Sequence, residues 1–269
     1  MSLNQGIHYR FSSSAVTLCE QLRKEFANPN QNDKTIKTLK ELKLLLANLG
    51  LLLPNTKDQK ELLLVRETIE MGALLAVRTH DVNAFERYIA QLFTFYRDYK
   101  NAIPESPRMY MLLGLNLLRL LSQTRLSEFH TLLETIGSTN LKNLYIQHPV
   151  QIEQALMEGS YNKVWNSKIN VPAPEYSFFM DTLMGTIRNE IASCSERAYE
   201  YLPLADASTL LYLENQDQML SFCQQRGWNV DLKTSRINFV SGDATGHFIP
   251  THDVIHNVLS YAQELERIV

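Results

Sequence analysis

Apolar residues recur every three or four positions along most of the chain, from Ser12 to Tyr201. This spacing predicts a succession of amphipathic helices, each with one apolar face. Residues that favour the first positions of a helix divide the run into segments. The expected helix starts lie at Asp33, at Asp58 with Glu61, at Asp81, at Ser106-Pro107 and at His148-Pro149. The connections are mostly short, so we expect neighbouring helices to pack antiparallel.

Two of the predicted helices resemble each other 44 positions apart. The apolar residues Val82, Phe85, Tyr88, Ile89 and Leu92 align with Leu126, Phe129, Leu132, Leu133 and Ile136. In the preceding helices, Gly72 and Gly114 leave room for a close neighbour. Such a repeat predicts helix pairs stacked into a right-handed α-solenoid over residues 1–171, with a shorter third pair around 151–165. The alternative is chance similarity between two amphipathic helices.

The pattern changes after residue 171. One long helix is expected over about 175–201, and two short helices follow near 205–213 and 217–226. Gly227 can end the second short helix as a left-handed cap. This part of the chain is therefore expected to form a separate helical unit.

A predicted β-hairpin follows these helices. Trp228 and Val230 alternate with polar residues, residues 233–236 can form a turn, and Ile237 and Phe239 alternate again. Alternation of this kind is typical of paired strands with one buried face. Helix, helix and hairpin in this order predict a winged helix over residues 172–250.

The last predicted helix, over residues 251–269, carries an apolar face that needs a cover. The spacing of its seam is that of a coiled coil or bundle, formed by Ile255, Val258, Ala262, Leu265 and Val269. The face is widened by Leu259, Tyr261 and Ile268. Either the helix folds back on its own domain or it docks among the helices of a partner.

Composition agrees with a mainly α protein, because the 269 residues include 41 Leu against 15 Ile and 12 Val. The 26 Lys and Arg residues nearly balance 29 Asp and Glu residues, and the net charge is −3. This balance argues against a cationic surface for nucleic acid or anionic lipid. The second winged-helix helix carries one cation, Arg226, and the hairpin tip adds Lys233 and Arg236. We therefore expect no nucleic-acid binding.

The sequence also predicts neither a membrane span nor a disulfide framework. The most apolar stretch, 109–121, is shorter than the roughly 20 residues that a spanning helix needs, and it contains Asn116 and Arg119. Residues 1–11 lack the features of a signal peptide. Three cysteines are too few and too far apart for paired bridges, namely Cys19, Cys194 and Cys223. We expect a soluble, intracellular protein.

No catalytic, metal or cofactor site is predicted. His252 and His256 lie one helical turn apart, but the Glu of an HExxH motif and a nearby third ligand are missing. The sequence contains no GxSxG motif, and residues 242–246 lack the Lys-Ser/Thr of a phosphate-binding loop. The cysteines lie in amphipathic helices, where Cys usually acts as a small apolar filler. We expect a protein that is not an enzyme and holds no cofactor.

Several longer strings carry a resemblance to a known family. They are Phe85-Glu-Arg-Tyr-Ile-Ala-Gln-Leu92, Pro104-Glu-Ser106, Leu112-Leu-Gly-Leu-Asn-Leu-Leu118, Glu128-Phe-His130, His148-Pro149, Leu156-Met-Glu-Gly-Ser-Tyr-Asn-Lys-Val164, Thr186-Ile-Arg-Asn-Glu-Ile191, Gln225-Arg-Gly-Trp228 and Tyr261-Ala-Gln-Glu-Leu-Glu-Arg-Ile-Val269. With these strings the chain resembles the small PCI-domain subunits of the proteasome regulatory particle lid, from about Leu39 to the C-terminus.

The resemblance implies a helical-repeat domain, a winged-helix (PCI) domain and a C-terminal assembly helix. It further implies a non-catalytic scaffold that is needed for lid assembly and for joining the lid to the base, in the cytoplasm and nucleus. The implied partners are other lid subunits with PCI domains and the base, in a hetero-oligomer. PCI domains associate partly through sheet edges and gather their C-terminal helices in a bundle. The helix residues named above and the hairpin residues Trp228, Val230, Ile237 and Phe239 are then the candidate interface.

Two other functions share parts of this fold. A small PCI subunit of the signalosome or of a translation initiation factor complex has the same helical-repeat and winged-helix plan. A nucleic-acid-binding winged-helix protein is the third hypothesis, and the charge distribution disfavours it. An enzyme is the fourth, without a motif that supports it.

Overall fold

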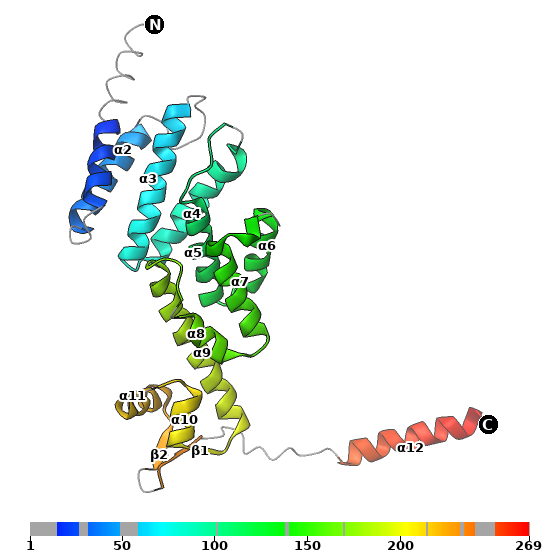
Figure 1. Ribbon diagram of the computed structural model, residues 1–269. Coiled ribbons are helices and arrows are strands. Elements are labelled where there is room, and N and C mark those ends of the chain that lie inside the picture. The colour runs from blue at the N-terminus through cyan, green and yellow to red at the C-terminus, as the bar shows by residue number, and fades with distance from the viewer. Residues whose placement is uncertain are drawn as a thin grey trace. The chain divides into compact units, whose positions relative to one another are not determined.

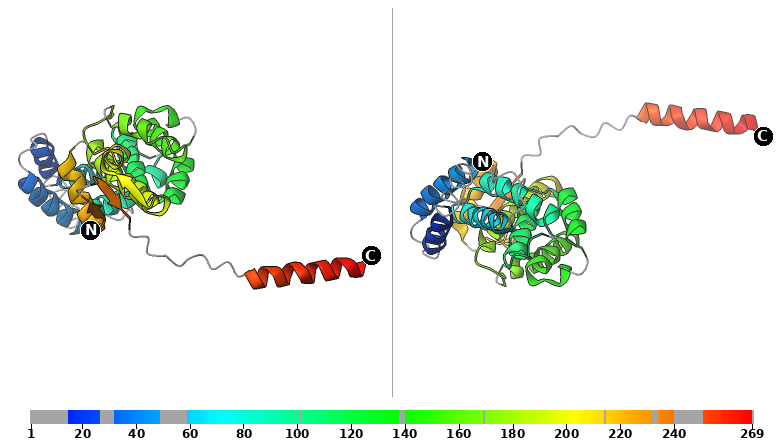
Figure 2. Two further views of the ribbon diagram at one scale, coloured as in Figure 1. Left: turned by 90° about the horizontal axis from the view of Figure 1, so that it is seen from below. Right: turned by 90° about the horizontal axis from the view of Figure 1, so that it is seen from above.

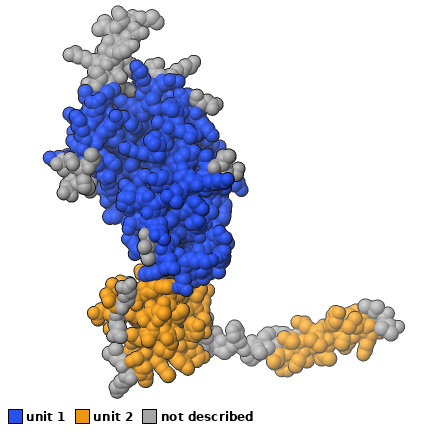
Figure 3. Space-filling view, in the orientation of Figure 1, with its two compact units in different colours: residues 1–186 blue, residues 187–269 orange. Residues whose placement is uncertain are grey.

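The computed structural model describes residues 15–26, 32–48, 59–100, 102–137, 140–168, 170–213, 215–231, 234–239 and 251–268 (Figure 1). These residues are mostly helical and include one small sheet, as the sequence predicts. The chain divides into two compact units, residues 1–186 and 187–269 (Figure 3). The division falls inside helix α9 (Tyr176–Ala198), and the domain bounds given above stay a prediction.

The first unit is a stack of helices in chain order. A helix over 15–26 is followed by α2 (Asn32–Asn48), α3 (Gln59–Arg78), α4 (Val82–Asp98), α5 (Met109–Ser122), α6 (Leu126–Ile136), the short 3-10 helix η1 (Asn140–Lys142), α7 (Leu144–Met157) and α8 (Tyr161–Ser167). Helix α3 packs against α4, α5 against α6 and α7, and α7 against α8 (Figures 1 and 2). The predicted pairing of successive helices is thereby confirmed.

Half of the repeated apolar positions lie in the core of this stack. Phe85, Ile89 and Leu92 of α4 are buried, as are Phe129 and Leu132 of α6. Asp81 caps α4, because its Oδ1 accepts a hydrogen bond from the Ala84 amide at 3.0 Å. Half of the ten aligned positions are therefore core positions, whereas Leu126 is exposed and the other four are partly buried.

Glycine is required where three helices meet. A Cβ atom on Gly114 of α5 would collide with the Tyr176 hydroxyl and with the carbonyl of Tyr145 in α7. Gly72 of α3 leaves space for the Tyr88 ring, which lies 2.8 Å from the position of the missing Cβ. The prediction that both glycines admit a close neighbour is confirmed.

The helix start predicted at His148-Pro149 is wrong. Helix α7 begins earlier, at Leu144, and Asn143 caps it by accepting from the Tyr145 amide at 3.2 Å. Pro149 therefore lies inside the helix, where its missing N–H leaves the Tyr145 carbonyl without its usual donor. The Tyr176 hydroxyl lies 3.2 Å from that carbonyl and 3.1 Å from the Met111 carbonyl, and its single hydrogen is shared between the two, which partly replaces the missing bond.

The start predicted at Ser106-Pro107 is also shifted, because α5 begins at Met109. The Ser106 hydroxyl still accepts from the Arg108 amide at 3.3 Å, but it donates to buried Glu70 at 2.9 Å. This tertiary bond holds Ser106 outside the helix.

The second unit contains α10 (Leu204–Leu210), α11 (Gln216–Arg226) and three short strands, β1 (Tyr201–Pro203), β2 (Asn229–Asp231) and β3 (Arg236–Asn238). The sheet is antiparallel with the order β1-β3-β2, and Ile237 of β3 lies between Leu202 and Val230. Gly227 ends α11 in the left-handed conformation at φ 71°. The predicted helix, helix and hairpin order is confirmed.

Strand β1 corrects the expected end of the long helix. Helix α9 ends at Ala198, and Tyr201 begins a strand. The Phe239 amide donates to the Glu200 carbonyl at 3.1 Å, and the Leu204 amide donates to the Ser235 carbonyl at 2.9 Å. These bonds come from residues more than thirty positions away, so the local pattern does not reveal the strand.

Helix α12 (Thr251–Ile268) is the last described element, and it begins at the predicted residue. Among the described residues, none of the helices combines the length and the apolar character that crossing a membrane requires.

Candidate protein-interaction surfaces

Helix α12 exposes a row of large apolar side chains. We call this surface the α12 face, formed by Val254, Ile255, Val258, Leu259, Tyr261, Ala262 and Leu265. The exposed fraction of its large side chains runs from 48% at Leu265 to 68% at Tyr261. The side chain of Ile268, and the whole of Val269, lie outside the described residues. Contiguous apolar exposure of this kind is typical of a binding surface.

The hairpin residues predicted as interface are mostly core residues of the second unit. Ile237 is fully buried and Phe239 is 6% exposed, in one cluster with Leu202 and Met219. Trp228 packs edge-on against Phe239, with ring centres 5.0 Å apart. The sequence alternation therefore identifies the inward face of the sheet.

The sheet offers one strand edge for further pairing. The bonds from Phe239 to Glu200 and from Leu204 to Ser235 place the N–H and C=O groups of Ile237 on the β1 side, since antiparallel strands alternate in this way. The groups of Arg236 and Asn238 then face β2, and the main-chain groups of Val230 point away from the sheet. On the other edge, Pro203 has no N–H to donate.

Two of the cations that a nucleic acid could contact are engaged within the protein, Arg226 and Arg236. Arg226 of α11 donates to the Asn189 carbonyl at 2.8 Å and lies 3.6 Å from a carboxylate oxygen of Glu196. Arg236 stacks over the Tyr201 ring at 5.0 Å. Lys233 lies outside the described residues. Cations that pair with their own chain contribute little to phosphate binding, so this arrangement favours protein partners over nucleic acid.

The residues tested for chemistry lie apart from one another. Cys19 and Cys223 are buried and Cys194 is exposed; burial raises the pKa of both buried thiols. His252 and His256 are exposed on α12. The described part of the chain holds no group of three or more residues that could bind a metal ion.

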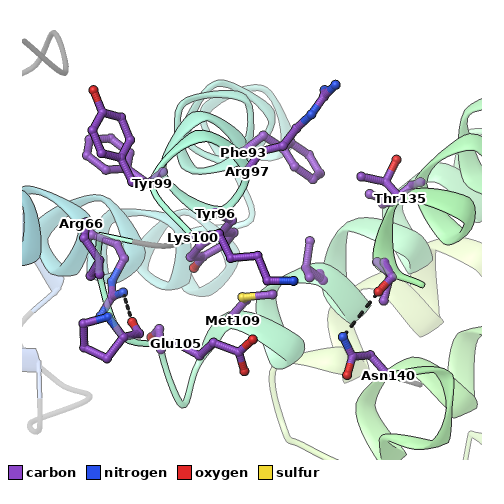
Figure 4. A pocket seen from close by; sticks show the side chains of 17 residues that line it. Arg66, Phe93, Tyr96, Arg97, Tyr99, Lys100, Glu105, Met109, Thr135 and Asn140 are labelled. Carbon is purple, nitrogen blue, oxygen red and sulfur yellow. Dashed lines mark hydrogen bonds between the residues drawn. The ribbon is translucent and has the colours of Figure 1, made fainter. Parts of the chain in front are cut away.

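Sequence analysis missed a cavity of about 150 Å³ in the first unit, which we call the α4–α6 cavity (Figure 4). It is lined by residues of α4, by the segment before α5 and by the C-terminal part of α6. Its walls are largely aromatic or aliphatic, including Phe93, Phe95, Ile103, Leu113 and Leu132.

One corner of this cavity is held by a buried carboxylate. Glu70 is 1% exposed and accepts from the Tyr96 hydroxyl at 2.8 Å and from Ser106 at 2.9 Å. Arg66 lies 3.6 Å from Glu70 and donates to the Pro104 carbonyl at 2.6 Å. Burial, and then the charge of Glu70, raise the pKa of Tyr96, which stays a hydroxyl donor. The corner fixes the segment before α5 against α3 and α4.

Stacked helix pairs, followed by two short helices and a three-stranded sheet, define a helical-repeat and winged-helix protein of the PCI type. A family model matches residues 107–247, and the chain belongs to the CSN8/PSMD8/EIF3K family.

Named relatives extend over nearly the whole chain. It is 40% identical to the 26S proteasome non-ATPase regulatory subunit 8 homolog A of Arabidopsis thaliana, over 93% of this chain and 96% of the relative. It is 36% identical to the 26S proteasome regulatory subunit rpn12 of Schizosaccharomyces pombe, over 87% and 92% of the two chains. Identity to the subunit RPN12 of Saccharomyces cerevisiae is 30%, over 87% and 91%.

Proposed function

We propose that the chain is a non-catalytic scaffold subunit of the proteasome regulatory particle lid, acting in lid assembly and in joining the lid to the base. The observation that carries this proposal is the identity of 40% to a named proteasome regulatory subunit over 93% of the chain. The family name alone covers three kinds of complex, whereas the named relatives all belong to the proteasome. The proposal places the protein in the cytoplasm and nucleus, where proteasomes act.

In this proposal the α12 face is the assembly anchor. Its large side chains are about half exposed or more, so a partner can remove their apolar surface from water. Fully burying one Val or Leu side chain contributes about 1.5–3 kcal/mol before the cost of ordering is subtracted. The outward main-chain groups of Val230 offer a second contact through strand addition.

The test compares two charge-matched variants of the tagged full-length chain in cells. Val258→Asp with Leu265→Asp places two carboxylates on the α12 face, while Ser260→Asp with Gln263→Asp places two on its polar side. Purified proteasomes are then analysed by mass spectrometry. We expect the first variant to be lost from the particle and the second to be retained.

Different results would contradict the assignment to the lid and the role of the α12 face as anchor. If wild type copurifies with the signalosome or with a translation initiation factor, and not with proteasome subunits, the assignment to the lid is wrong. If wild type enters proteasomes and the Val258/Leu265 variant does so equally well, the lid assignment stands and the α12 anchor is wrong.

A further inference from the structure

Two cations beside the α4–α6 cavity form no ion pair with the described part of the chain. Arg97 and Lys100 are exposed, lie one turn apart at the end of α4, and line the cavity. Figure 4 shows the Lys100 side chain lying across the cavity, with Glu105 and Met109 on one side and Thr135 further off on the other. Glu105 is the one acidic residue among those that line the cavity, so the rim carries a net positive charge.

The size and the walls of the cavity suit one apolar ring. An enclosed cavity of about 150 Å³ lined by Leu, Ile and Phe binds benzene, which indicates the volume that one aromatic ring needs. The α4–α6 cavity has this volume, and Phe93, Tyr96, Ile103 and Leu132 are among its walls. A Phe side chain therefore fits it better than a polar group does.

The cavity continues into a longer hollow along α4 and α6. A second hollow of about 340 Å³ shares Phe93, Arg97, Leu132 and Thr135 with the cavity. A single small molecule would fill the cavity alone, whereas a peptide chain can place one side chain in it and continue along the hollow. This continuity favours an extended segment as the occupant.

The other charges of the hollow hold its wall together. Glu86 lies 3.1 Å from both Arg119 and Arg125, and Arg125 also pairs with Glu128 at 2.5 Å. Burial raises the pKa of Glu86, but the positive charges and hydrogen bonds of Arg119 and Arg125 outweigh it, and the net shift is downward. The Glu86 carboxylate therefore stays ionised at neutral pH. These residues have partners already, which leaves Arg97 and Lys100 for a ligand.

We propose that the α4–α6 cavity is a docking site for an acidic linear segment of a partner protein. The segment places one aromatic side chain in the cavity and its carboxylates beside Arg97 and Lys100. Charge complementarity selects this occupant, since unpaired cations beside an apolar cavity attract a chain that carries both features. The site is built from elements other than α12, and its occupation does not depend on the assignment to the proteasome.

The probe is a fluorescent peptide in which one Phe is flanked on both sides by Asp and Glu, titrated with the full-length chain. Arg97→Glu with Lys100→Glu should weaken binding about tenfold, because two attractions become repulsions. The matched control is Lys37→Glu with Lys40→Glu, which reverses two exposed cations at the same spacing on α2 and should leave binding unchanged.

Two further variants separate the parts of the site. Glu105→Gln removes the one carboxylate on the rim and should tighten binding of the acidic peptide several-fold. Thr135→Trp covers the cavity from an exposed position of α6 and should weaken binding without removing a core side chain. Replacing Phe by Ala in the peptide should weaken binding as much.

The proposal is overturned if the peptide does not bind, or if the Lys37/Lys40 control weakens binding as much as the Arg97/Lys100 variant. It is also overturned if phenylacetate binds as tightly as the peptide, because the site then takes a small acid and not a chain. Thermal unfolding of each variant confirms that a loss of binding is not a loss of fold.

Discussion

Helices α4 and α12 have nearly the same length, 17 and 18 residues, and both carry a continuous apolar face. In α4 that face is covered, with Phe85 and Leu92 fully buried. In α12 the corresponding side chains are open, with Val258 62% exposed and Leu259 59% exposed. The same spacing of apolar residues therefore gives a buried face in α4 and an exposed face in α12.

The difference lies in whether neighbouring helices cover the apolar face. Helix α4 faces α3 of its own helix pair and α5 of the next pair, and Gly72 lets the Tyr88 ring approach α3 closely. A solenoid helix is covered by the next helix of the stack. Among the described residues no helix covers the α12 face in this way, so the face can bind another protein. Periodicity predicts that a face will be buried, but not which molecule covers it.

The largest expected effect comes from truncating a buried side chain of α4, compared with an exposed side chain of α12. Phe85→Ala should lower the free energy of unfolding of the isolated chain by about 3–5 kcal/mol, since it leaves a cavity in a packed core. Val258→Ala should change it by less than about 0.5 kcal/mol, because that side chain is already in water. Chemical denaturation measures both. A large loss for Val258→Ala would mean that α12 packs on its own chain.

A somewhat smaller loss is expected at the junction of α5, α7 and α9. Gly114→Ala should cost about 3 kcal/mol, because its Cβ would press against Tyr176 and the Tyr145 carbonyl and disturb the bond that compensates for Pro149.

Gly185 of α9 is the matched control for this substitution, since a Cβ there meets nothing within 4 Å. Gly185→Ala should stabilise the chain by about 0.5–1 kcal/mol through helix propensity alone. Equal effects at Gly114 and Gly185 in thermal unfolding would show that the junction is not tightly packed.

Most of the fold follows from the sequence because the helices are long and strongly periodic. The helix starting near Asp33, the cap at Asp81, the stop at Gly227 and the hairpin all depend on local chemistry. The start of α7 at Leu144 could not be found in this way, because a tyrosine 27 positions after Pro149 hydrogen-bonds to the carbonyl that lacks its N–H donor. Strand β1 is likewise fixed by residues distant in sequence.

The candidate surfaces were predictable to different degrees. The apolar stripe of α12 is visible in the sequence, but the stripe alone does not tell whether the same chain or a partner covers it. The α4–α6 cavity arises where residues from several helices and the segment before α5 meet, and no segment reveals it alone. One signal was present: Phe93, Tyr96 and Tyr99 form an aromatic run near the end of α4, beyond the positions that align with α6.

The buried carboxylate behind this cavity gives a third, smaller effect. Tyr96→Phe removes a hydroxyl that donates to Glu70 at 2.8 Å and should cost about 1.5 kcal/mol, the range for bonds to charged groups. The control is Tyr110→Phe, since Tyr110 donates to exposed Glu105 at 3.4 Å and should be nearly neutral. If urea denaturation gives equal values for both, Glu70 does not depend on Tyr96.

The smallest effect depends on pH and concerns His148 in α7. Burial lowers the pKa of its imidazole below the usual 6.5, although the bond to the Ser167 carbonyl acts in the opposite direction. The unfolded chain therefore binds a proton more readily than the folded chain, and stability falls as the pH drops below about 6.5.

His148→Gln isolates this contribution, since its amide can still donate to Ser167 but does not titrate. Between pH 7 and 5 the variant should lose less unfolding free energy than wild type. Denaturation midpoints at several pH values give the difference between the two proteins, which cancels the other titrating groups. Parallel curves would mean that the imidazole is protonated equally in both states, and that α7 is as open to water at this position as α12 is along its apolar face.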